Sequence, residues 1–429
     1  MVPRSPVATG VFFFRDLLFR CLWCSPSIYP IFIVGMKDLP EGLPLDRMNP
    51  FVYLDYNATT PLDNGVLEVM LPLLSRAWGN PSSIHQAGRH ARVILDDCRE
   101  KVASRLGCKP SEIIFTSGGT ESSNLAICGM ARANRTRGRH IITSSIEHHA
   151  VLHTCQYIAA NEGFDLTILP VSSEGRIDPQ SVKDSLRKDT CLVSVMAANN
   201  EIGTLQPISA IGDICRAAGV PFHTDAVQWF GKLPCSGIGQ FNADLVSICA
   251  HKLHGPKGAG ALYMRSPLQL HPTMLGGAHE NERRAGTENL AAIAGLADCL
   301  DRFVAEPVFP VATMLQLTSR LRFLLKTIPG VTVVTPELDV LPNTVTCVVE
   351  RAEGIALVAG LDLEGICVSS GAACSAGSLE PSHVIEAIGM PCLANSVLRF
   401  SFGRENTLLD LDVLELHLRR VIQRAQAPQ

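Results

Sequence analysis

Apolar runs rich in β-branched residues alternate with longer amphipathic stretches from Phe51 onward, and this alternation restricts the fold more than any other feature. Windows such as 121–134 and 208–219 have the apolar spacing of helices. The runs between such windows are expected to be strands, at 112–117, 140–145, 191–197, 220–225, 244–250 and 260–264. A strand–helix–strand order predicts an α/β fold with a mainly parallel sheet covered by helices on both faces.

The length of the chain favours more than one domain. Its 429 residues, 46% of them hydrophobic, suffice for one large and one smaller domain. The segment "AEPVFPVAT" at 305–313 indicates a boundary, because new strand and helix signals begin after it. We expect an N-terminal extension (1–50), a large domain (65–303) and a small domain formed by 51–64 and 304–429. The net charge of −4 gives no sign of a nucleic-acid partner.

The N-terminal extension is apolar and aromatic, but charged residues and prolines interrupt it before it reaches the roughly 20 residues of a membrane helix. Three interpretations are open: an organelle-targeting segment, a peripheral amphipathic anchor, or an upstream extension read from a start site that is not the one used. Met36 and Met48 are alternative starts. We favour an extension without a catalytic role, and a cytoplasmic protein unless the extension targets an organelle.

Polar side chains follow the expected strands at the points where ligands bind in open α/β sheets. The turn "SGGTES" at 117–122 has two glycines before Thr120 opens a helix, whose free N–H groups suit a phosphate. A glycine-rich turn between a strand and a helix binds an anion about as often as it serves only as a connection. His148 and His149 follow the next strand, and a histidine pair in a loop is more often structural than catalytic.

Two further strand ends narrow the chemistry. Asp225 ends one apolar strand and Lys252 follows the next. A partly buried lysine amine suits a Schiff base, and an aldehyde cofactor with a pyridine ring and a phosphate would need this amine, a carboxylate and an anion cradle. Taken alone, an aspartate or a lysine at the end of a strand is more often a helix cap or a surface charge than part of an active site. His251 and His254 have a spacing that could suit a metal, but they do not lie in an expected helix and no third ligand is near them in the sequence, so we do not assign a metal site.

The chain has fifteen cysteines, an odd number without a disulfide framework, which favours reduced thiols in a cytosol-like environment. A cysteine taken at random is expected to be buried as a small hydrophobe. Cys374 differs from the others because the stretch "SSGAACSAGSLEPS" at 369–382 surrounds it with small residues. It is therefore a candidate reagent.

A set of longer stretches occurs in a fixed order along the chain. They are "YLDYNATTP" (53–61), "GNPSS" (79–83), "FTSGGTES" (115–122), "EHHAVL" (147–152), "NNEIGTLQP" (199–207), "HTDAVQ" (223–228), "AHKLHGPKGAGALY" (250–263), "RRAGTEN" (283–289), "SSGAACSAGSLEPSHV" (369–384) and "LRFSFGR" (398–404). With them, from about Val52 to Arg424, the chain resembles class V pyridoxal-phosphate enzymes of the NifS/IscS cysteine desulfurase group. The resemblance implies fold type I, the aspartate-aminotransferase-like fold with a seven-stranded sheet and a smaller α+β domain.

The resemblance assigns four residues to the ring of pyridoxal 5'-phosphate. Lys252 would hold the cofactor as a Schiff base, and Asp225 would keep the ring nitrogen protonated. Gln228 would hydrogen-bond the phenolic oxygen of the ring. His148 would stack on the ring face and assist proton transfer.

The resemblance also assigns the phosphate contacts. Gly119, Thr120 and His251 would hold the phosphate, and Thr287 would reach it from the partner subunit of a homodimer. Cys249 occupies a position on the phosphate side where many relatives have serine. A thiol is a poorer hydrogen-bond donor than a hydroxyl.

Asn200 and Arg399 would bind the substrate carboxylate, for which a guanidinium fork is suited. Attack by the thiolate of Cys374 on the sulfur of L-cysteine would leave a persulfide on the enzyme and release L-alanine. The resemblance thus implies a cysteine desulfurase for iron–sulfur cluster assembly or other sulfur transfer, with a sulfur-acceptor protein such as an iron–sulfur scaffold as partner. A selenocysteine lyase, a class V aminotransferase and an inactive sulfur-transfer scaffold are the alternatives.

Overall fold

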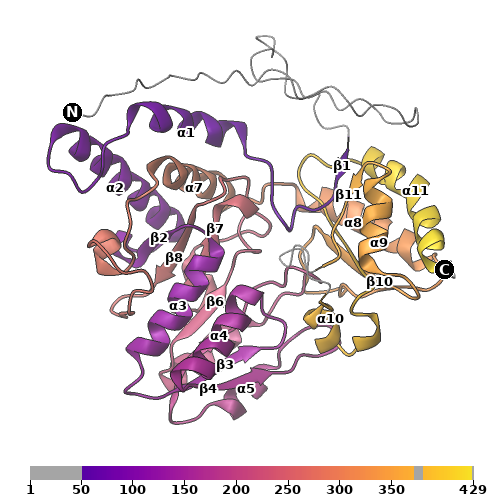
Figure 1. The fold of residues 1–429 in the computed structure, drawn as a ribbon, viewed down its shortest axis with the longest axis horizontal. Coiled ribbons are helices and arrows are strands. Elements are labelled where there is room, and N and C mark those ends of the chain that lie inside the picture. Colours follow the sequence, from indigo (N-terminus) through magenta and orange to yellow (C-terminus); the bar gives the residue numbers. More distant parts are fainter. Residues whose placement is uncertain (1–50, 372–379, 428–429) are drawn as a thin grey trace, which may run out of the picture. The chain divides into compact units, whose positions relative to one another are not determined.

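The computed structural model describes residues 51–371 and 380–427, and its largest element is a seven-stranded sheet (Figure 1). The strand order is β2-β8-β7-β6-β5-β3-β4, and all neighbours are parallel except β8, which is antiparallel to β2 and β7. The bounds are β2 (Ile113–Thr116), β3 (His140–Ser144), β4 (Asp165–Leu169), β5 (Thr190–Ser194), β6 (Phe222–Asp225), β7 (Leu245–Cys249) and β8 (Gly260–Met264). The mainly parallel sheet expected from the sequence is confirmed.

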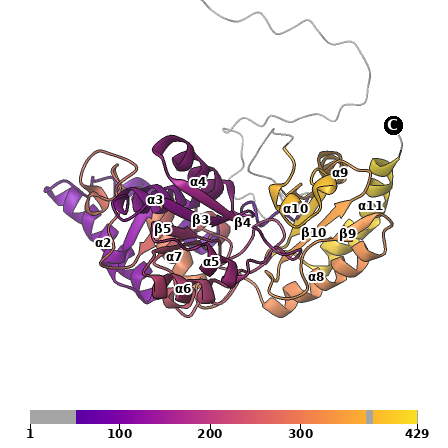
Figure 2. The same ribbon diagram turned by 90° about the horizontal axis from the view of Figure 1, so that it is seen from below.

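Helices cover both faces of this sheet (Figure 2). Alternate residues of one strand enter different cores: Ile113 and Phe115 pack on one side, and Ile114 packs on the other. The first core includes residues of α1 (Asn64–Arg76), α2 (Gln86–Leu106), α5 (Pro179–Ser185), α6 (Ile208–Ala218) and α7 (Leu290–Phe303). The second includes residues of α3 (Gly119–Ala133) and α4 (His149–Glu162).

A separate core forms around a three-stranded antiparallel sheet of order β12-β10-β9. Leu54 packs into this core, and the adjacent β1 pairs in parallel with β11. We propose that this core belongs to the small domain expected from residues 51–64 and 304–429. The bounds are β1 (Val52–Tyr53), β9 (Val331–Val333), β10 (Thr344–Val349), β11 (Ile366–Cys367), β12 (Val397–Ser401), α8 (Val311–Lys326), α9 (Gly354–Asp362), α10 (His383–Ala387) and α11 (Leu408–Gln426).

Short 3-10 turns complete the described chain, at η2 (Pro110–Glu112), η3 (Ile238–Phe241), η4 (Ala250–Lys252), η5 (His279–Glu282) and η6 (Pro391–Leu393). Within the described ranges, no helix is both long and apolar enough to cross a membrane. The expectations for the extension 1–50 and for Cys374 concern residues outside the described ones.

The segment that follows β1 joins the two sheets. Asn57 N donates to Ser401 Oγ of β12 (2.9 Å), and Thr60 N donates to the carbonyl of His251 beyond β7 (3.0 Å). Residues of this segment are therefore held against the carboxyl ends of the large sheet and against the small sheet at once.

Candidate active site

A pocket lies at the carboxyl ends of β2, β3, β6 and β7 and also includes a residue of β12. It brings together Gly119, Thr120, His148, Asn200, Asp225, Gln228, Cys249, His251, Lys252 and Arg399, all of which the sequence proposed for the site. Thr287 is not part of the lining and is exposed in this chain. Cys374 lies outside the described residues.

Asp225 and Lys252 face the pocket from neighbouring strands. Asp225 ends β6, and its Oδ1 accepts a hydrogen bond from Val227 N (2.9 Å). Burial raises the pKa of Asp225 to about 6, while this hydrogen bond and the charge of Lys252 oppose the rise. Lys252 follows β7, and its Nζ donates to the carbonyls of Asn57 and Ala58 (2.6 Å each).

His148 caps the N-terminus of α4, because its Nδ1 accepts from Ala150 N (3.1 Å). Burial, and then the charge of Lys252, lower the pKa of His148 to about 4. The ring is therefore neutral at pH 7. Since Nδ1 is an acceptor, the ring proton is on Nε2.

The N-terminus of α3 is open toward the pocket. Gly118 occupies the N-cap position with φ +155, and this glycine has no side chain that could make an N-cap hydrogen bond. A Cβ on Gly119 would lie 2.6 Å from Val227 Cγ2, so only glycine fits there. Uncapped N–H groups and the helix dipole favour an anion at this point.

Cys249 and His251 line the same end of the pocket. Burial raises the pKa of the Cys249 thiol, so it is protonated at pH 7. Burial lowers the pKa of His251 to about 4, and its Nδ1 lies 3.1 Å from Thr59 Oγ1. The groups around the open helix end are therefore neutral hydrogen-bonding partners.

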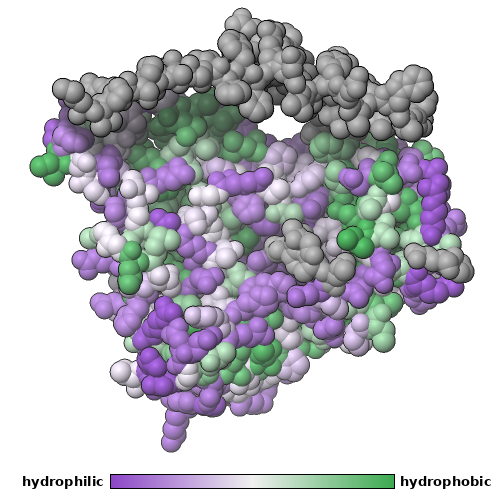
Figure 3. All heavy atoms as spheres, viewed as in Figure 1, coloured by the Kyte–Doolittle hydropathy of each residue, from purple (hydrophilic) through white to green (hydrophobic). Residues whose placement is uncertain are grey.

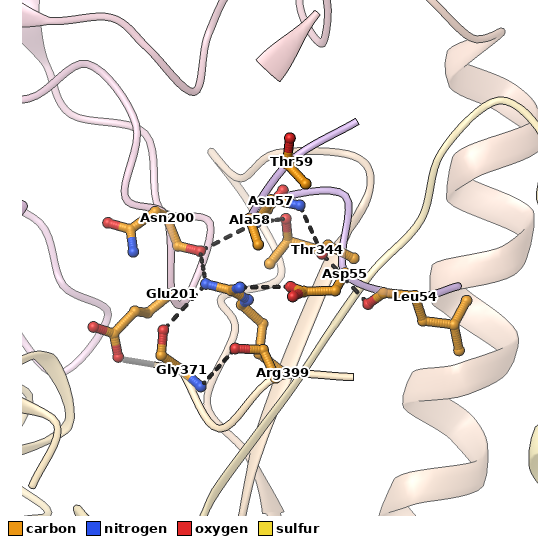
Figure 4. A network of polar contacts seen from close by, with 12 residues as sticks. Leu54, Asp55, Asn57, Ala58, Thr59, Asn200, Glu201, Thr344, Gly371 and Arg399 are labelled. Atoms are coloured by element: carbon orange, nitrogen blue, oxygen red, sulfur yellow. Dashed lines mark hydrogen bonds and ion pairs between the residues drawn. The ribbon is translucent and has the colours of Figure 1, made fainter. Parts of the chain in front are cut away.

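Arg399 projects from β12 and is almost fully buried, at 1% exposure (Figure 4). Its Nη2 donates to Asp55 Oδ1 (2.7 Å), and its Nη1 donates to the carbonyls of Asn200 (3.0 Å) and Gly371 (3.2 Å). Its buried Nε has no partner among the described residues. The sequence paired Asn200 with Arg399, and the structure brings them together through the main-chain oxygen of Asn200.

Asp55 and Asn57 were not assigned a role from the sequence, although both belong to the quoted stretch 53–61. The carbonyl of Asn57 accepts from Lys252 and from Gln228 Nε2 (3.0 Å). The Nδ2 of Asn57 donates to the carbonyl of Asn200 (3.1 Å) and to Thr344 Oγ1 (2.9 Å) (Figure 4). The available signal was a polar run directly after a short strand.

The histidines after β3 form a cluster at the pocket. The rings of His149 and His153 stack at 4.4 Å, and the ring of His383 lies 4.7 Å from that of His149. Within the described ranges, no three His, Cys, Asp or Glu side chains form a group that could hold a metal ion. Every cysteine in these ranges is a free thiol.

A strand-end lysine, a buried carboxylate and an open helix N-terminus on such a sheet define an enzyme of pyridoxal-phosphate fold type I. The model of the aminotransferase class-V family matches residues 52–414, and the chain belongs to this family. Enzymes of the family generally depend on pyridoxal phosphate.

The chain is similar to the cysteine desulfurase IscS of Dictyoglomus turgidum, with 47% identity over 375 residues, 87% of this chain and 95% of the relative. A solved NifS-like protein has a TM-score of 0.80 and 36% identity over 87% of this chain and 99% of its own. The solved structure of SspA in complex with cysteine has a TM-score of 0.73 and 36% identity, and the match covers 83% of this chain and 100% of SspA.

Proposed function

We propose that this protein is a cysteine desulfurase that transfers the sulfur of L-cysteine to Cys374 and releases L-alanine. One observation carries the proposal: Lys252 and Asp225 from the large sheet and Arg399 from β12 line a single pocket. The similarity to proteins named cysteine desulfurase supports it.

Pyridoxal 5'-phosphate fits the residues of the pocket. The uncapped start of α3 at Gly119 suits its phosphate, the buried Asp225 suits its ring nitrogen, and the amine of Lys252 suits its aldehyde. Bound there, the cofactor supplies an electron sink for the α-carbon of an amino acid. Gln228 would hold the phenolic oxygen.

Arg399 and Asn200 would bind the carboxylate of L-cysteine. Asp55 holds the Arg399 guanidinium through Nη2, and the Nε of Arg399 has no partner among the described residues. The buried position excludes water from this contact, which strengthens it. The solved relative described as a complex with cysteine supports the choice of substrate.

His148 would assist proton transfer at its Nε2, because Nδ1 is held by Ala150 N–H. The low pKa of His148, caused mainly by burial, keeps the ring neutral over the physiological pH range. With its proton on Nε2, the neutral ring would act from that atom as a hydrogen-bond donor toward the cofactor, and it could accept a proton there only after its own proton has left.

The thiolate of Cys374 would attack the substrate sulfur. A new S–S bond forms, the bond between the β-carbon and sulfur breaks, and its electron pair remains with the carbon fragment. This fragment takes up a proton and leaves as alanine. L-cysteine and the enzyme thiol thus become L-alanine and an enzyme persulfide, for delivery to an iron–sulfur scaffold or another acceptor protein.

A homodimer is part of the proposal. Trp78 and Ile84, near the end of α1, are 79% and 90% exposed, and the apolar Leu71 and Leu74 of α1 are also exposed. Hydrophobic residues, drawn in green, reach the surface in the region of α1 (Figure 3). An exposed apolar surface of this kind is typical of an interface. The exposed Thr287 would then contact the phosphate in the partner subunit.

Cys374→Ser tests the central claim. The variant should retain bound cofactor but form alanine at a rate lower by several orders of magnitude, because it lacks the nucleophile. Alanine and sulfide are measured together with L-cysteine and a thiol reductant, and L-selenocysteine is compared. Cys392→Ser is the matched control, since Cys392 is exposed and does not belong to the pocket lining. Near-normal alanine formation by Cys374→Ser would refute the proposal.

A further inference from the structure

A second lysine lies behind the pocket. Lys232 is 2% exposed and does not belong to the pocket lining. The preceding Gly231 has φ +76, and a Cβ there would lie 2.6 Å from the Cβ of Leu253. This close approach of the backbone, which only glycine permits, brings Lys232 into the interior.

The amine of Lys232 contacts two amides that belong to the site. Its Nζ donates to Asn57 Oδ1 (2.7 Å) and to Gln228 Oε1. Gln228 lines the pocket, and its other amide atom, Nε2, donates to the carbonyl of Asn57. That carbonyl also accepts from Lys252. The amine of Lys232 therefore contacts the side chains of Asn57 and Gln228, and the main-chain carbonyl of Asn57 is the group that accepts from Lys252.

The surroundings of Lys232 do not favour its charge. Burial, and then the positive charges of Lys252 and Arg399, lower its pKa well below the usual lysine range, and among the described residues the charge of Asp55 opposes this shift. Its hydrogen-bond acceptors are two amide oxygens rather than a carboxylate. Burying an amine in this way costs free energy. Stability alone gives little reason for a lysine at this position.

The hydrogen bond from Lys232 determines the orientation of the Gln228 amide, because it holds Oε1 on the side of the lysine and leaves Nε2 on the other side. An N–H donor next to a glutamine side chain selects its oxygen and turns the NH₂ group away. We propose that Lys232 is a positioning residue for the cofactor: it holds Gln228 with Nε2 as the donor on the pocket side. The phenolic oxygen of pyridoxal phosphate, which Gln228 would contact, is an acceptor. This inference rests on the proposed function.

The alternative is a purely structural role, in which Lys232 only ties residues 53–58 to the segment after β6. The two roles differ in their coupling to Gln228. If Lys232 acts through Gln228, its removal has little further effect on cofactor binding once Gln228 has been replaced. If its role is structural, the two substitutions act additively.

A double-mutant cycle on the full-length protein separates these cases. Lys232→Met, Gln228→Leu and the double variant are stripped of cofactor and titrated with pyridoxal phosphate, and absorbance gives the dissociation constant and the spectrum of the bound form. We expect each single variant to bind between about tenfold and about a hundredfold more weakly. We expect the double variant to bind no more weakly than Gln228→Leu, and both single variants to show the same spectral change.

The control is Lys326→Met, which removes an exposed lysine paired with Glu337 and should leave the titration unchanged. If Lys232→Met does not fold, Lys232→Gln, which keeps one donor group, replaces it in the cycle. Additive losses, or unchanged binding by the Lys232 variant, would overturn the inference and leave the proposed function intact. A wild-type chain that binds no pyridoxal phosphate would overturn both.

Discussion

The two sides of the pocket use different physical means to hold their charged groups. On the side of the large sheet, burial dominates: it raises the pKa of Asp225 to about 6 and lowers that of His148 to about 4. On the side of β12, pairing dominates. There the guanidinium of Arg399 is held by Asp55 and by two main-chain carbonyls.

This difference separates two tasks. Burial changes the protonation state of a group, so the large-sheet side is suited to moving protons at pH 7. Pairing fixes the direction of a group without changing its charge, so the β12 side is suited to orienting a substrate. Substitutions on the first side should therefore impair the chemical step, and substitutions on the second should impair substrate binding.

The largest effect is expected at Lys252. Lys252→Ala should reduce alanine formation by several orders of magnitude, because the variant lacks the pocket amine that would attach the cofactor. Lys232 cannot replace it, since Lys232 lies behind Asn57 and outside the pocket lining. Alanine release and the absorbance of bound cofactor are the measurements.

Lys257→Ala is the control for this substitution, because Lys257 is exposed and close to Lys252 in sequence. Its activity should be near that of the wild type. Substantial alanine formation by Lys252→Ala would show that the large-sheet side does not contain the essential amine.

A smaller effect is expected at Asp55. Asp55→Asn keeps the size of the side chain but removes the charge that holds Arg399 Nη2. Loss of a charged hydrogen bond to a buried group is worth between about tenfold and about a hundredfold. The KM for L-cysteine should rise by this factor while kcat changes much less, as steady-state kinetics will show.

The matched control is Asp63→Asn, which alters another carboxylate of the same segment. Asp63 pairs with Arg404 and caps α1, and it does not contact Arg399. This variant should lose stability but keep its KM. A fall in kcat at constant KM for Asp55→Asn would contradict the division of tasks between the two sides.

The sequence was more informative about one side of the pocket than about the other. Asp225, Lys252 and Thr120 follow strands of one sheet, and the rule that ligands bind at strand ends located them without a structure. The resemblance to a known family added Arg399. Of the seven strands in the large sheet, β4 was missed, because it lies at the sheet edge and only one of its five residues is buried, so it does not form a continuous buried run.

The hydrogen-bonded groups behind the pocket could not be predicted. Asn57 contacts Gln228, Lys232 and Lys252, all of which lie far along the chain. Neither periodicity nor composition reports such distant pairing. A buried lysine is also an unusual choice for an interior position, so a lysine after a glycine is expected at the surface. Only the folded chain shows that Lys232 is inside.

The last prediction concerns stability rather than catalysis, and it uses Glu147 to test whether burial controls protonation on the large-sheet side beyond the reacting groups. Glu147 precedes His148, and its Oε1 accepts from Ser144 Oγ (2.5 Å) and from Met196 N (3.0 Å). Its buried Oε2 has no partner among the described residues. Burial raises the pKa of Glu147 to about 8.

The raised pKa fixes the sign of the pH dependence. Between the ordinary glutamate pKa and about 8, the folded protein keeps a proton on Glu147 that the unfolded chain has released. The free energy of unfolding contributed by this group therefore falls as the pH rises, by up to about 1.4 kcal/mol for each pH unit. The side chain introduced in the variant Glu147→Gln does not titrate, so the stability of this variant relative to the wild type should increase from pH 5 to pH 8. The ratio of the two unfolding constants should change by as much as about tenfold per pH unit. Urea unfolding at four pH values gives this difference.

Glu112→Gln is the matched control, because both oxygens of the buried Glu112 accept backbone N–H groups, from Lys109 and Ser266. A difference that does not change with pH for Glu147→Gln would mean that the carboxyl is ionised in the folded protein, and burial would then not be what controls protonation on this side of the pocket.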